Sequence, residues 1–526
     1  MFLRKSLTIV ALLIGSHDVF AQQVATADDY LSEDSIPITL PDGGTICMQV
    51  IRRKDASQQP SILWYDIYAD SSSSFIERSK ILAAKYGYAL LTANPRGKKC
   101  SPDSIKPFET EAEDAYHIID WISKQPWSNG KVGMLGGSYL GFSQWATAKK
   151  IHPALKTIVP QVSVGIGIDY PTQNGVFTSY TLRWVKMVTN NKLTDFESFN
   201  DTLAWPSLVK KWYAGGYPFR SLDSLDGQNN HVFQNWLKHP TYDDYWKKMT
   251  PQKEEFSKIN IPILSVTGYW DDDQLGAMYY YKEYMKYNPN GEHYLLIGPY
   301  DHPGGGGYIR DTVAGMVTES KAKEYNKKMI YGWFDYILKD SSKPELLKDK
   351  VNFFMTGENK WYHAPALDQI SNNVWKLYLN NGRLEETISA QREMNGLEVD
   401  LKKRDLQDYA ISKIMDPLPI LRDTLEIIPD QKYFYTDIIS EEQYLCGDIA
   451  VNLIFKTNKK DVDFLFDLYE VKKDGKTWLL NEFVQRASLI KDRSRRNLLK
   501  PGKTYHMKID KNFIVCKKIE NLKSHN

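Results

Sequence analysis

Short apolar runs alternate with amphipathic segments through the first 160 residues. The runs are typical of buried strands and occur at 61–66, 88–93, 132–135 and 155–160. Between them, 75–86 and 112–124 have helical periodicity, with the apolar residues of the second on one face. Strands that alternate with helices predict a parallel sheet covered by helices on both faces. A β-hairpin over 36–53 precedes this unit.

The alternation stops between residues 169 and 257, where five tryptophans lie among charged, helix-like stretches. We expect a mostly helical insertion that caps the carboxyl edge of the sheet; a separate helical domain is the alternative. Strand-like runs return at 261–267 and 294–297, with a helix between them and a closing helix over 321–338. The polar stretch 339–343 predicts a linker.

Beyond the linker the apolar period changes to two, the period of a half-buried strand. Such runs, with Asn-Gly and Asp-Gly turns, occur at 351–355, 374–379, 449–455, 464–471 and 478–484. They predict a second, all-β sandwich domain over 345–526. The first domain is then an α/β unit over 22–168 and 258–340, with the cap 169–257 inserted.

Composition and charge narrow the classes of function. The 526 residues are 42% hydrophobic, which is enough for packed cores, and the 67 basic and 65 acidic residues are spread along the chain. No basic block suggests nucleic-acid binding. Arg4 and Lys5 precede an apolar run over 7–15, and small residues follow it, which predicts a secretory signal peptide over 1–21. Because this run is too short to span a membrane, we expect a secreted or periplasmic protein.

Four cysteines remain for structural roles: Cys47, Cys100, Cys446 and Cys516. Their spacing matches no metal-binding motif. An exported protein can pair them, although a core of this size does not require disulfides. Structural thiols and one or two disulfides are therefore both compatible with the sequence.

Residues 131–142 carry a catalytic pattern, because a strand, a glycine-rich turn and a helix follow one another there. Ser138 stands in the turn, with Gly137 before it and Gly141 after it. This is the pattern of a nucleophile elbow, in which glycines let strand and helix approach while the serine takes a strained backbone. Leu140 stands where the usual pattern has glycine, so a simple turn is the alternative.

A serine attacks a carbonyl only when a base takes its proton and a third group orients that base. In this architecture the acid and the histidine follow the serine, on loops after later strands. Of ten histidines, His302 best meets this rule, and Asp271 directly follows the strand 261–267 and an aromatic pair. Ser138, Asp271 and His302 are the candidate triad. Asp271 begins a run of three aspartates, for which a cation site or a solvated turn is the alternative.

With these motifs the chain resembles the CocE/NonD hydrolases, which include cocaine-esterase-like enzymes, X-Pro dipeptidyl-peptidases, glutaryl acylases and α-amino-acid ester hydrolases. The resemblance covers nearly everything after the signal segment. The segment Gly136-Gly-Ser-Tyr-Leu-Gly141 matches the family's motif Gly-x-Ser-Tyr-x-Gly. Three further segments show the resemblance: Gly268-Tyr-Trp-Asp271, Gly298-Pro-Tyr-Asp-His302 and 351–359. It also explains Leu140, since this family places its second glycine one residue later.

The resemblance implies an α/β-hydrolase domain with a helical cap and a C-terminal jelly roll. It further implies an oxyanion hole made by the backbone amide of Tyr139 and the hydroxyl of Tyr68, which follows an early strand. Two donors aimed at the tetrahedral oxygen stabilise charge that appears only in the transition state. Exposed aromatic residues are common at strand ends, and an aromatic without a catalytic role is the alternative for Tyr68. The family's jelly roll runs on past the segment 513–518, so a shortened β domain is a further expectation.

Within the family the motifs are most similar to the α-amino-acid ester hydrolases, which hold a substrate ammonium with a carboxylate cluster. The matching positions here are Asp169, Asp273 and Gln274. An amide thus replaces one carboxylate, and the resemblance implies a weaker attraction for an ammonium group.

The sequence therefore predicts an exported serine hydrolase that cleaves a small ester or amide, such as an α-amino-acid ester or a short peptide, through an acyl-enzyme. An X-Pro dipeptidyl-peptidase or a simple acyl esterase is the alternative within this chemistry. A non-catalytic binding protein on the same scaffold is the alternative of another class. We expect no cofactor, metal, nucleic acid or membrane span. Specificity and self-association stay open.

Overall fold

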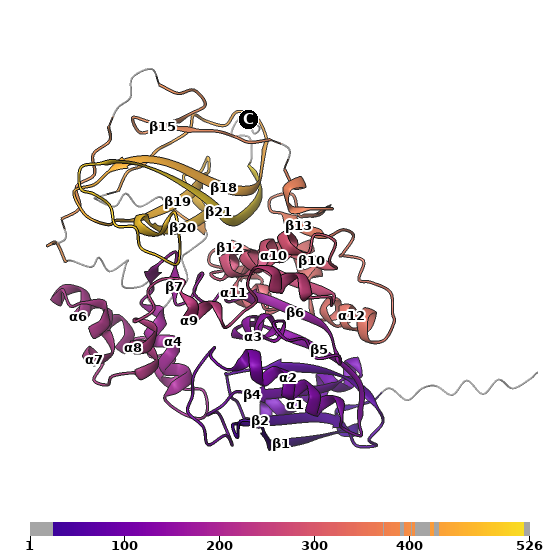
Figure 1. Ribbon diagram of the computed structural model, residues 1–526. Coiled ribbons are helices and arrows are strands. Elements are labelled where there is room, and N and C mark those ends of the chain that lie inside the picture. Colours follow the sequence, from indigo (N-terminus) through magenta and orange to yellow (C-terminus); the bar gives the residue numbers. More distant parts are fainter. Residues whose placement is uncertain are drawn as a thin grey trace, which may run out of the picture.

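The computed structural model describes residues 25–371, 373–389, 394–400, 402–404, 421–424 and 431–519. The predicted signal peptide, 1–21, lies outside the described residues. Within the part of the chain that the structure describes, no helix has both the length and the apolar character needed to cross a bilayer. In Figure 1 the C-terminal β domain lies above the α/β domain, and the helices of the insertion lie beside both.

A ten-stranded mixed sheet forms the centre of the α/β domain. Its middle strands are parallel, and the neighbouring strands at each edge run antiparallel. In spatial order the strands are β1 (Tyr30–Thr39), β2 (Thr45–Arg53), β4 (Ala89–Asn94), β3 (Gln59–Tyr65), β5 (Ser128–Ser138), β6 (Leu155–Ser163), β9 (Ile263–Trp270), β10 (His293–Asp301), β13 (Val351–Met355) and β14 (Lys360–Ala364). The predicted parallel order is confirmed for the middle strands, and the antiparallel edge strands make the sheet mixed.

Helices cover both faces of this sheet because consecutive strand residues point to opposite sides. On β5, Met134 packs into one core and Leu135 into the other. The first core also contains residues of α2 (Glu111–Ser123), α3 (Tyr139–Thr147) and α10 (Gln274–Tyr287). The second contains residues of α1 (Ser73–Tyr86) and α12 (Lys327–Leu338).

The insertion is mostly helical, as predicted, and it is not packed as a separate unit. It contains the hairpin β7 (Thr172–Gln173) and β8 (Val176–Phe177), the helices α4 (Tyr180–Thr189), α5 (Phe196–Phe199), α6 (Ala204–Gly215), α7 (Leu222–Leu225), α8 (His231–Trp236) and α9 (Asp244–Lys247), and short 3-10 turns. Trp184 and Trp236 share one apolar cluster with Tyr139 and Phe142 of α3. The insertion therefore packs directly on the helix that follows Ser138.

The C-terminal domain is built from antiparallel strands. One sheet pairs β18 (Gln443–Lys456) with β21 (Thr504–Ile519); another has β17 (Leu421–Arg422), β20 (Thr477–Arg486) and β19 (Asp463–Val471) in spatial order; β15 (Tyr378–Asn380) pairs with β16 (Arg383–Glu385). The predicted all-β domain is confirmed. The run 351–355 is an exception: as β13 it pairs in parallel with β10, and all five residues are buried. It extends the large sheet because a strand buried on both faces fits there.

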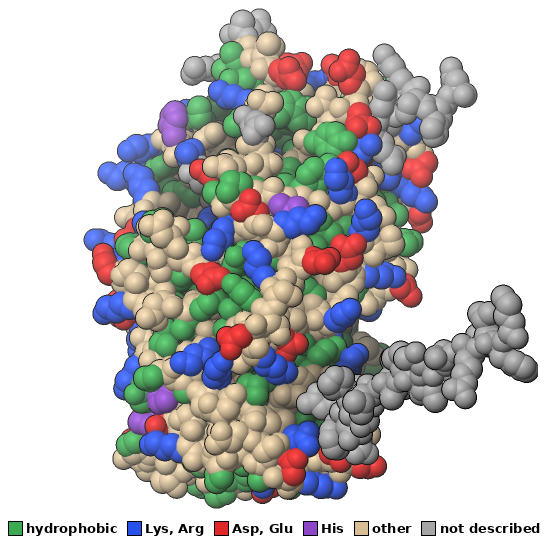
Figure 2. All heavy atoms as spheres, turned by 90° about the vertical axis from the view of Figure 1, so that its right-hand side faces the viewer, with side chains coloured by type: hydrophobic (Ala, Val, Ile, Leu, Met, Phe, Trp, Pro, Cys, Tyr) green, Lys and Arg blue, Asp and Glu red, His purple; other side chains and the backbone are tan. Residues whose placement is uncertain are grey.

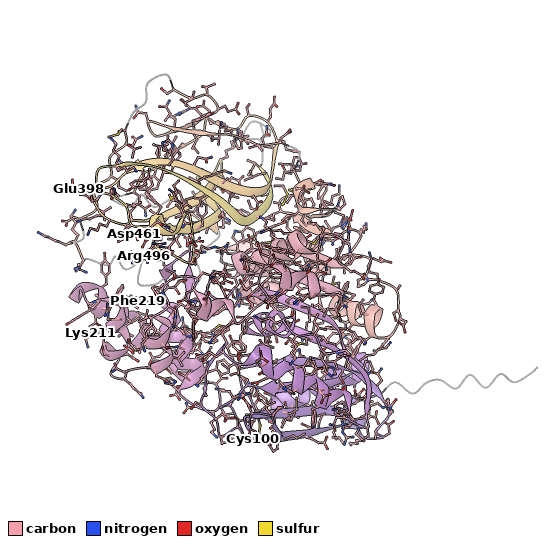
Figure 3. All side chains as sticks on the ribbon, in the orientation of Figure 1. Cys100, Lys211, Phe219, Glu398, Asp461 and Arg496 are labelled. Carbon is pink, nitrogen blue, oxygen red and sulfur yellow. A yellow bond between two sulfur atoms is a disulfide. The ribbon has the colours of Figure 1, made fainter. Side chains whose placement is uncertain are left out.

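Two disulfides pair the four cysteines. Cys47 of β2 is bonded to Cys100, at the end of the molecule remote from the β domain (Figure 3). Cys446 is bonded to Cys516, its register partner across the β18–β21 pair. The sequence left free thiols and one or two disulfides open, and the structure contains two disulfides.

The β domain contacts both the insertion and the large sheet. Asn174, in the β7–β8 turn, donates a hydrogen bond from Nδ2 to the carbonyl of Val484 at 2.8 Å, and Trp270 at the end of β9 donates to the carbonyl of Leu479 at 2.8 Å. The ion pair Asp461–Arg496 lies at the edge of the β domain that faces the insertion (Figure 3). Figure 2 shows basic and acidic side chains intermingled over one face of the molecule.

Candidate active site

Ser138 lies at the junction of β5 and α3, as the elbow pattern predicts. Its backbone has φ 62° and ψ −123°, a strained conformation for a residue with a side chain. The strand β5 ends at this serine and α3 begins with Tyr139. The serine therefore sits at the carboxyl edge of the sheet, at the N-terminal end of a helix whose free amides favour negative charge.

Close packing around the turn explains the glycine at 141. A Cβ atom at Gly141 would lie 2.5 Å from Ser163 Oγ and 2.8 Å from the carbonyl oxygen of Gln161, both at the end of β6. Gln144 of α3 reinforces the turn, since its Nε2 donates to the carbonyl of Gly136 at 3.1 Å. Its Oε1 accepts from the backbone of β6 at 2.8 Å. No sequence pattern predicts this role of Gln144, because an amide within a helix carries no pattern of its own.

Asp271 and His302 are joined by a hydrogen bond of 2.8 Å between Asp271 Oδ1 and His302 Nδ1. Asp271 directly follows β9 and is 4% exposed, and Thr267 Oγ1 donates to its other oxygen at 2.7 Å. The backbone amide of Asp273 also donates to Asp271, at 3.1 Å. The carboxylate is therefore fixed from several sides, and it orients the imidazole ring with its Nε2 directed away from the acid.

The turn that carries His302 packs against the elbow. The short helix α11 (His302–Gly305) begins directly after β10, and Asp301 caps it by accepting from the amide of Gly304 at 2.9 Å. A Cβ atom at Gly137 would lie 3.5 Å from Cα of Gly306, so the turn passes beside the residue that precedes Ser138. Among the described residues no hydrogen bond joins Ser138 to His302; such contacts often tighten only when substrate binds.

Tyr68 lies beside Ser138 at the same edge of the sheet. Its backbone amide donates to Asp66 Oδ1 at 2.7 Å, and its hydroxyl oxygen accepts from Trp184 Nε1 at 2.9 Å. Burial raises the pKa of Tyr68, although hydrogen bonds with Trp184 and Ser138 lower it. The phenol is thus protonated at neutral pH and also at more alkaline pH than an ordinary tyrosine, so Tyr68 can donate a hydrogen bond near the serine.

Tyr139 offers its backbone amide beside Ser138, while its side chain is fully buried. The phenol donates a hydrogen bond to Glu111 Oε1, and Glu111 is itself buried at the start of α2. Burial raises the pKa of Glu111 to about 7, and the hydrogen bond from Tyr139 lowers it. This contact fixes the first residue of α3, and only the tertiary structure reveals it.

Three aspartates surround His302 with negative charge. Burial lowers the pKa of the imidazole, but Asp273, Asp271 and Asp272 outweigh it and raise the pKa to about 10. Asp273 Oδ2 lies 3.5 Å from His302 Nδ1. Burial raises the pKa of Asp273 to about 8, although the nearby His302 lowers it. The protonation of His302 and that of Asp273 therefore depend on each other.

The same three groups have the spacing of a cation site, one of the alternatives for the aspartate run. Ligand atoms of Asp271, Asp273 and His302 lie within 4.8 Å of one another. The shortest contact among them is the hydrogen bond between Asp271 and His302. A bound cation would have to displace that hydrogen bond from His302 Nδ1.

Two of the residues implied by the ester-hydrolase resemblance have their polar groups in use. Asp169 accepts from the backbone amides of Gly165, at 2.8 Å, and Gly276, one to each oxygen. Burial raises its pKa, and Asp273 raises it further. It therefore ties the segment after β6 to the first turn of α10.

Gln274 has backbone partners for both ends of its side-chain amide. Its Nε2 donates to the carbonyls of Gly268 at 2.6 Å and Ile514 at 3.1 Å, and its Oε1 accepts from the amide of Ile514 at 2.7 Å. Both amide hydrogens are thus used to join β9 to β21 of the C-terminal domain. These hydrogen bonds favour a structural role for Gln274, and the substrate role that the resemblance implied stays a prediction.

Residues 42–304, half of the chain, match the X-Pro dipeptidyl-peptidase (S15) family. The chain belongs to this family. Residues 354–512 match the C-terminal non-catalytic domain of X-Pro dipeptidyl-peptidases. The S15-family protein is therefore a hydrolase of the esterase or peptidase type, and the resemblance inferred from its motifs is confirmed.

Several relatives resemble this S15-family hydrolase over nearly its whole length. Cocaine esterase of Rhodococcus sp. (strain MB1 Bresler) is 21% identical over 513 residues, which are 92% of this chain and 88% of that protein. An aminopeptidase from a marine sediment archaeon (Thaumarchaeota archaeon) superposes with a TM-score of 0.73 at 18% identity, covering 95% of this chain and 89% of the other. An α-amino acid ester hydrolase gives 0.69 at 20% identity, with coverages of 97% and 91%. These two structures support the fold.

Changing Gln274 of the S15-family hydrolase to Glu should lower its free energy of unfolding by about 2–4 kcal/mol. The new carboxylate would face the carbonyls of Gly268 and Ile514 without a hydrogen to donate. Denaturant unfolding followed by tryptophan fluorescence measures the change, with the exposed Gln58→Glu as the control for added charge. Unchanged stability together with tighter binding of an α-amino ester would instead support the substrate role.

Changing Asp273 to Asn should lower the pKa of His302 by about 1 unit or more, because the nearest unpaired negative charge is removed. A raised pKa means that the imidazole loses its proton only at high pH, so the variant should lose it at lower pH. NMR titration of protein with ¹³C-labelled histidine follows this directly, with His302→Gln assigning the signal. Asp272→Asn should give a smaller shift; equal shifts would contradict the special role of Asp273.

Proposed function

We propose that this chain is an exported serine hydrolase that cleaves small esters or amides bearing a free α-amino group. The catalytic part of this proposal rests on one observation, the 2.8 Å hydrogen bond between Asp271 and His302. His302 lies on a turn that packs beside Ser138, whose backbone is strained. A strained serine at a strand–helix junction, with an acid and a histidine after later strands, is the arrangement that α/β-hydrolases use for acyl transfer.

In the proposed mechanism Ser138 Oγ attacks the substrate carbonyl while His302 Nε2 accepts the hydroxyl proton. Asp271 orients the imidazole and stabilises the imidazolium that forms. The amide of Tyr139 and the hydroxyl of Tyr68 donate to the oxyanion of the tetrahedral intermediate. His302 then protonates the leaving group, and the acyl-enzyme remains on Ser138. Water, activated by His302, attacks this ester and releases the acid.

A substrate ammonium fits the excess of negative charge beside His302. Asp273 offers a carboxylate 3.5 Å from the imidazole, and burial raises its pKa to about 8. A bound cation would lower that pKa and hold Asp273 ionised. Asp169 offers a further carboxyl group nearby, although both of its oxygens already accept backbone hydrogen bonds. The aminopeptidase and the α-amino acid ester hydrolase with the same fold support this substrate class.

The family match to X-Pro dipeptidyl-peptidases favours a second candidate, cleavage of a peptide after proline. The same catalytic groups would serve, because amide and ester hydrolysis share the acyl-enzyme. The identity of the acyl group separates the two candidates.

Two observations support export. The segment 1–21 has the charge and apolar pattern of a secretory signal peptide. All four cysteines are paired in disulfides, which persist in oxidising compartments such as a periplasm or the extracellular space.

A fluorophosphonate probe should label the wild-type protein once and leave Ser138→Ala unlabelled, because only an activated serine reacts. Intact-mass spectrometry counts the adducts. His302→Ala should also stay unlabelled. The matched control is His239→Ala, since His239 forms another histidine–aspartate hydrogen bond, 2.7 Å to Asp243, within the insertion. Folded wild-type protein without an adduct would rule out the proposed hydrolase.

A substrate panel should show higher kcat/KM for an α-amino-acid ester than for its N-acetyl derivative. We expect a preference of roughly tenfold, the worth of one charge-assisted contact. Asp273→Asn should reduce this ratio toward one, because the variant lacks the charge that distinguishes the two substrates. An unchanged ratio would leave Asp273 without a role in binding the ammonium. Faster cleavage of an X-Pro amide than of any ester would favour the dipeptidyl-peptidase candidate.

A further inference from the structure

One side chain of the insertion contacts the proposed oxyanion hole directly. Trp184, on α4, donates from its indole Nε1 to the hydroxyl oxygen of Tyr68 at 2.9 Å. The two rings meet edge to face, with centroids 6.4 Å apart. Trp184 is 4% exposed, so water does not compete strongly for this hydrogen bond. A donor from the insertion thus contacts the group that is expected to stabilise the oxyanion.

The α4 helix is tied to the α/β domain at its carboxyl end. The ammonium of Lys98, in the loop after β4, donates to the carbonyls of Val188 and Asn191 at 2.9 Å each and of Leu193 at 3.3 Å. Lys98 is completely buried, so the contact is part of the packed interior. A cation at the carboxyl end of a helix also favours the helix dipole. Trp184 therefore lies on a helix whose carboxyl end is anchored to the α/β domain.

The backbone around Tyr68 is fixed from two further sides. Its amide donates to Asp66 Oδ1 at 2.7 Å. The next residue, Ala69, accepts at its carbonyl from the amide of Thr194 at 3.2 Å, and Thr194 follows α4. The insertion therefore forms hydrogen bonds both with the backbone beside Tyr68 and with the hydroxyl group of its side chain. The same hydroxyl lies next to Ser138.

We propose that Trp184 is a positioning residue for Tyr68: its indole N–H occupies an acceptor site of the phenol oxygen, so that the phenol hydrogen is directed toward the oxyanion formed at Ser138. This inference rests on the proposed function, because it assumes that Tyr68 donates to the oxyanion. A phenol that accepts one hydrogen bond is also polarised and donates a stronger one. The insertion is then a part of the catalytic machinery as well as a cover.

A purely structural role for Trp184 is the competing explanation. Its ring packs in an aromatic cluster with Phe108, Tyr139 and Trp236, at centroid distances of 5.4, 6.1 and 6.2 Å. Loss of its ring volume would therefore disturb α3 and the elbow whatever the N–H does. A test has to keep an aromatic ring at position 184 and ask whether its effect depends on the hydroxyl of Tyr68.

A double-mutant cycle between Trp184→Phe and Tyr68→Phe makes that test. We expect Tyr68→Phe to lower kcat for an ester by roughly 100- to 1000-fold, as the loss of an oxyanion donor does. Trp184→Phe should lower kcat by about 3- to 10-fold, the worth of one neutral hydrogen bond, with little change in KM. In the Tyr68→Phe background the same change should have almost no effect, because the N–H has no hydroxyl to orient.

Trp236→Phe is the matched control, since Trp236 stacks on Trp184 in the same cluster. It should leave kcat within about twofold, and thermal unfolding of each variant checks that the fold survives. If Trp184→Phe lowers kcat equally in both backgrounds, or Trp236→Phe lowers it as much, Trp184 acts by packing and the inference is wrong. If Tyr68→Phe retains wild-type kcat while Ser138→Ala is inactive, the oxyanion role of Tyr68 fails instead.

Discussion

The backbone at Ser138 is the constraint on which the rest of the site depends. A residue with a side chain is held at φ 62°, so the serine stands clear of both β5 and α3. Such strain persists only when the surroundings prevent relaxation, and here several contacts do so. Gly141 lets α3 approach β6, Gln144 bonds both, and Glu111 holds the side chain of Tyr139. The position of the candidate nucleophile is thus a property of the packed sheet and its helices.

The site also unites parts of the chain that lie far apart in sequence. Four residues of the candidate site lie at or just after the carboxyl ends of parallel strands in the large sheet: Tyr68, Ser138, Asp271 and His302. These strand ends meet at one edge of the sheet. The C-terminal domain and the insertion stabilise this edge from outside. Gln274 and Trp270 connect the segments next to Asp271 with the β domain, and Trp184 connects the insertion with Tyr68. Both added units therefore support the segments that carry the candidate site residues.

The electrostatic character of the site comes from crowding carboxylates around one imidazole. Asp273, Asp271 and Asp272 raise the pKa of His302 to about 10 against the effect of burial. In the free protein this favours the protonated histidine, which is a poor base. A substrate ammonium would offset the negative charge of Asp273 and lower the pKa of His302 toward a value suited to proton transfer. Substrate charge and catalytic competence are therefore coupled in the proposed function.

Local patterns in the sequence predicted most helices and strands, the elbow and the order of Ser138, Asp271 and His302. They did so because hydrophobic period, glycine placement and chain order can be read from neighbouring residues. They misassigned the strand at 351–355, since a short buried run fits either domain until its partner is known. Only the tertiary structure decided that Gln274 bonds β21, and that Glu111 and Trp184 contact the two tyrosines of the candidate site. These contacts join residues that are 28 to 240 positions apart. Their chemistry depends on distance in space, which no local pattern encodes.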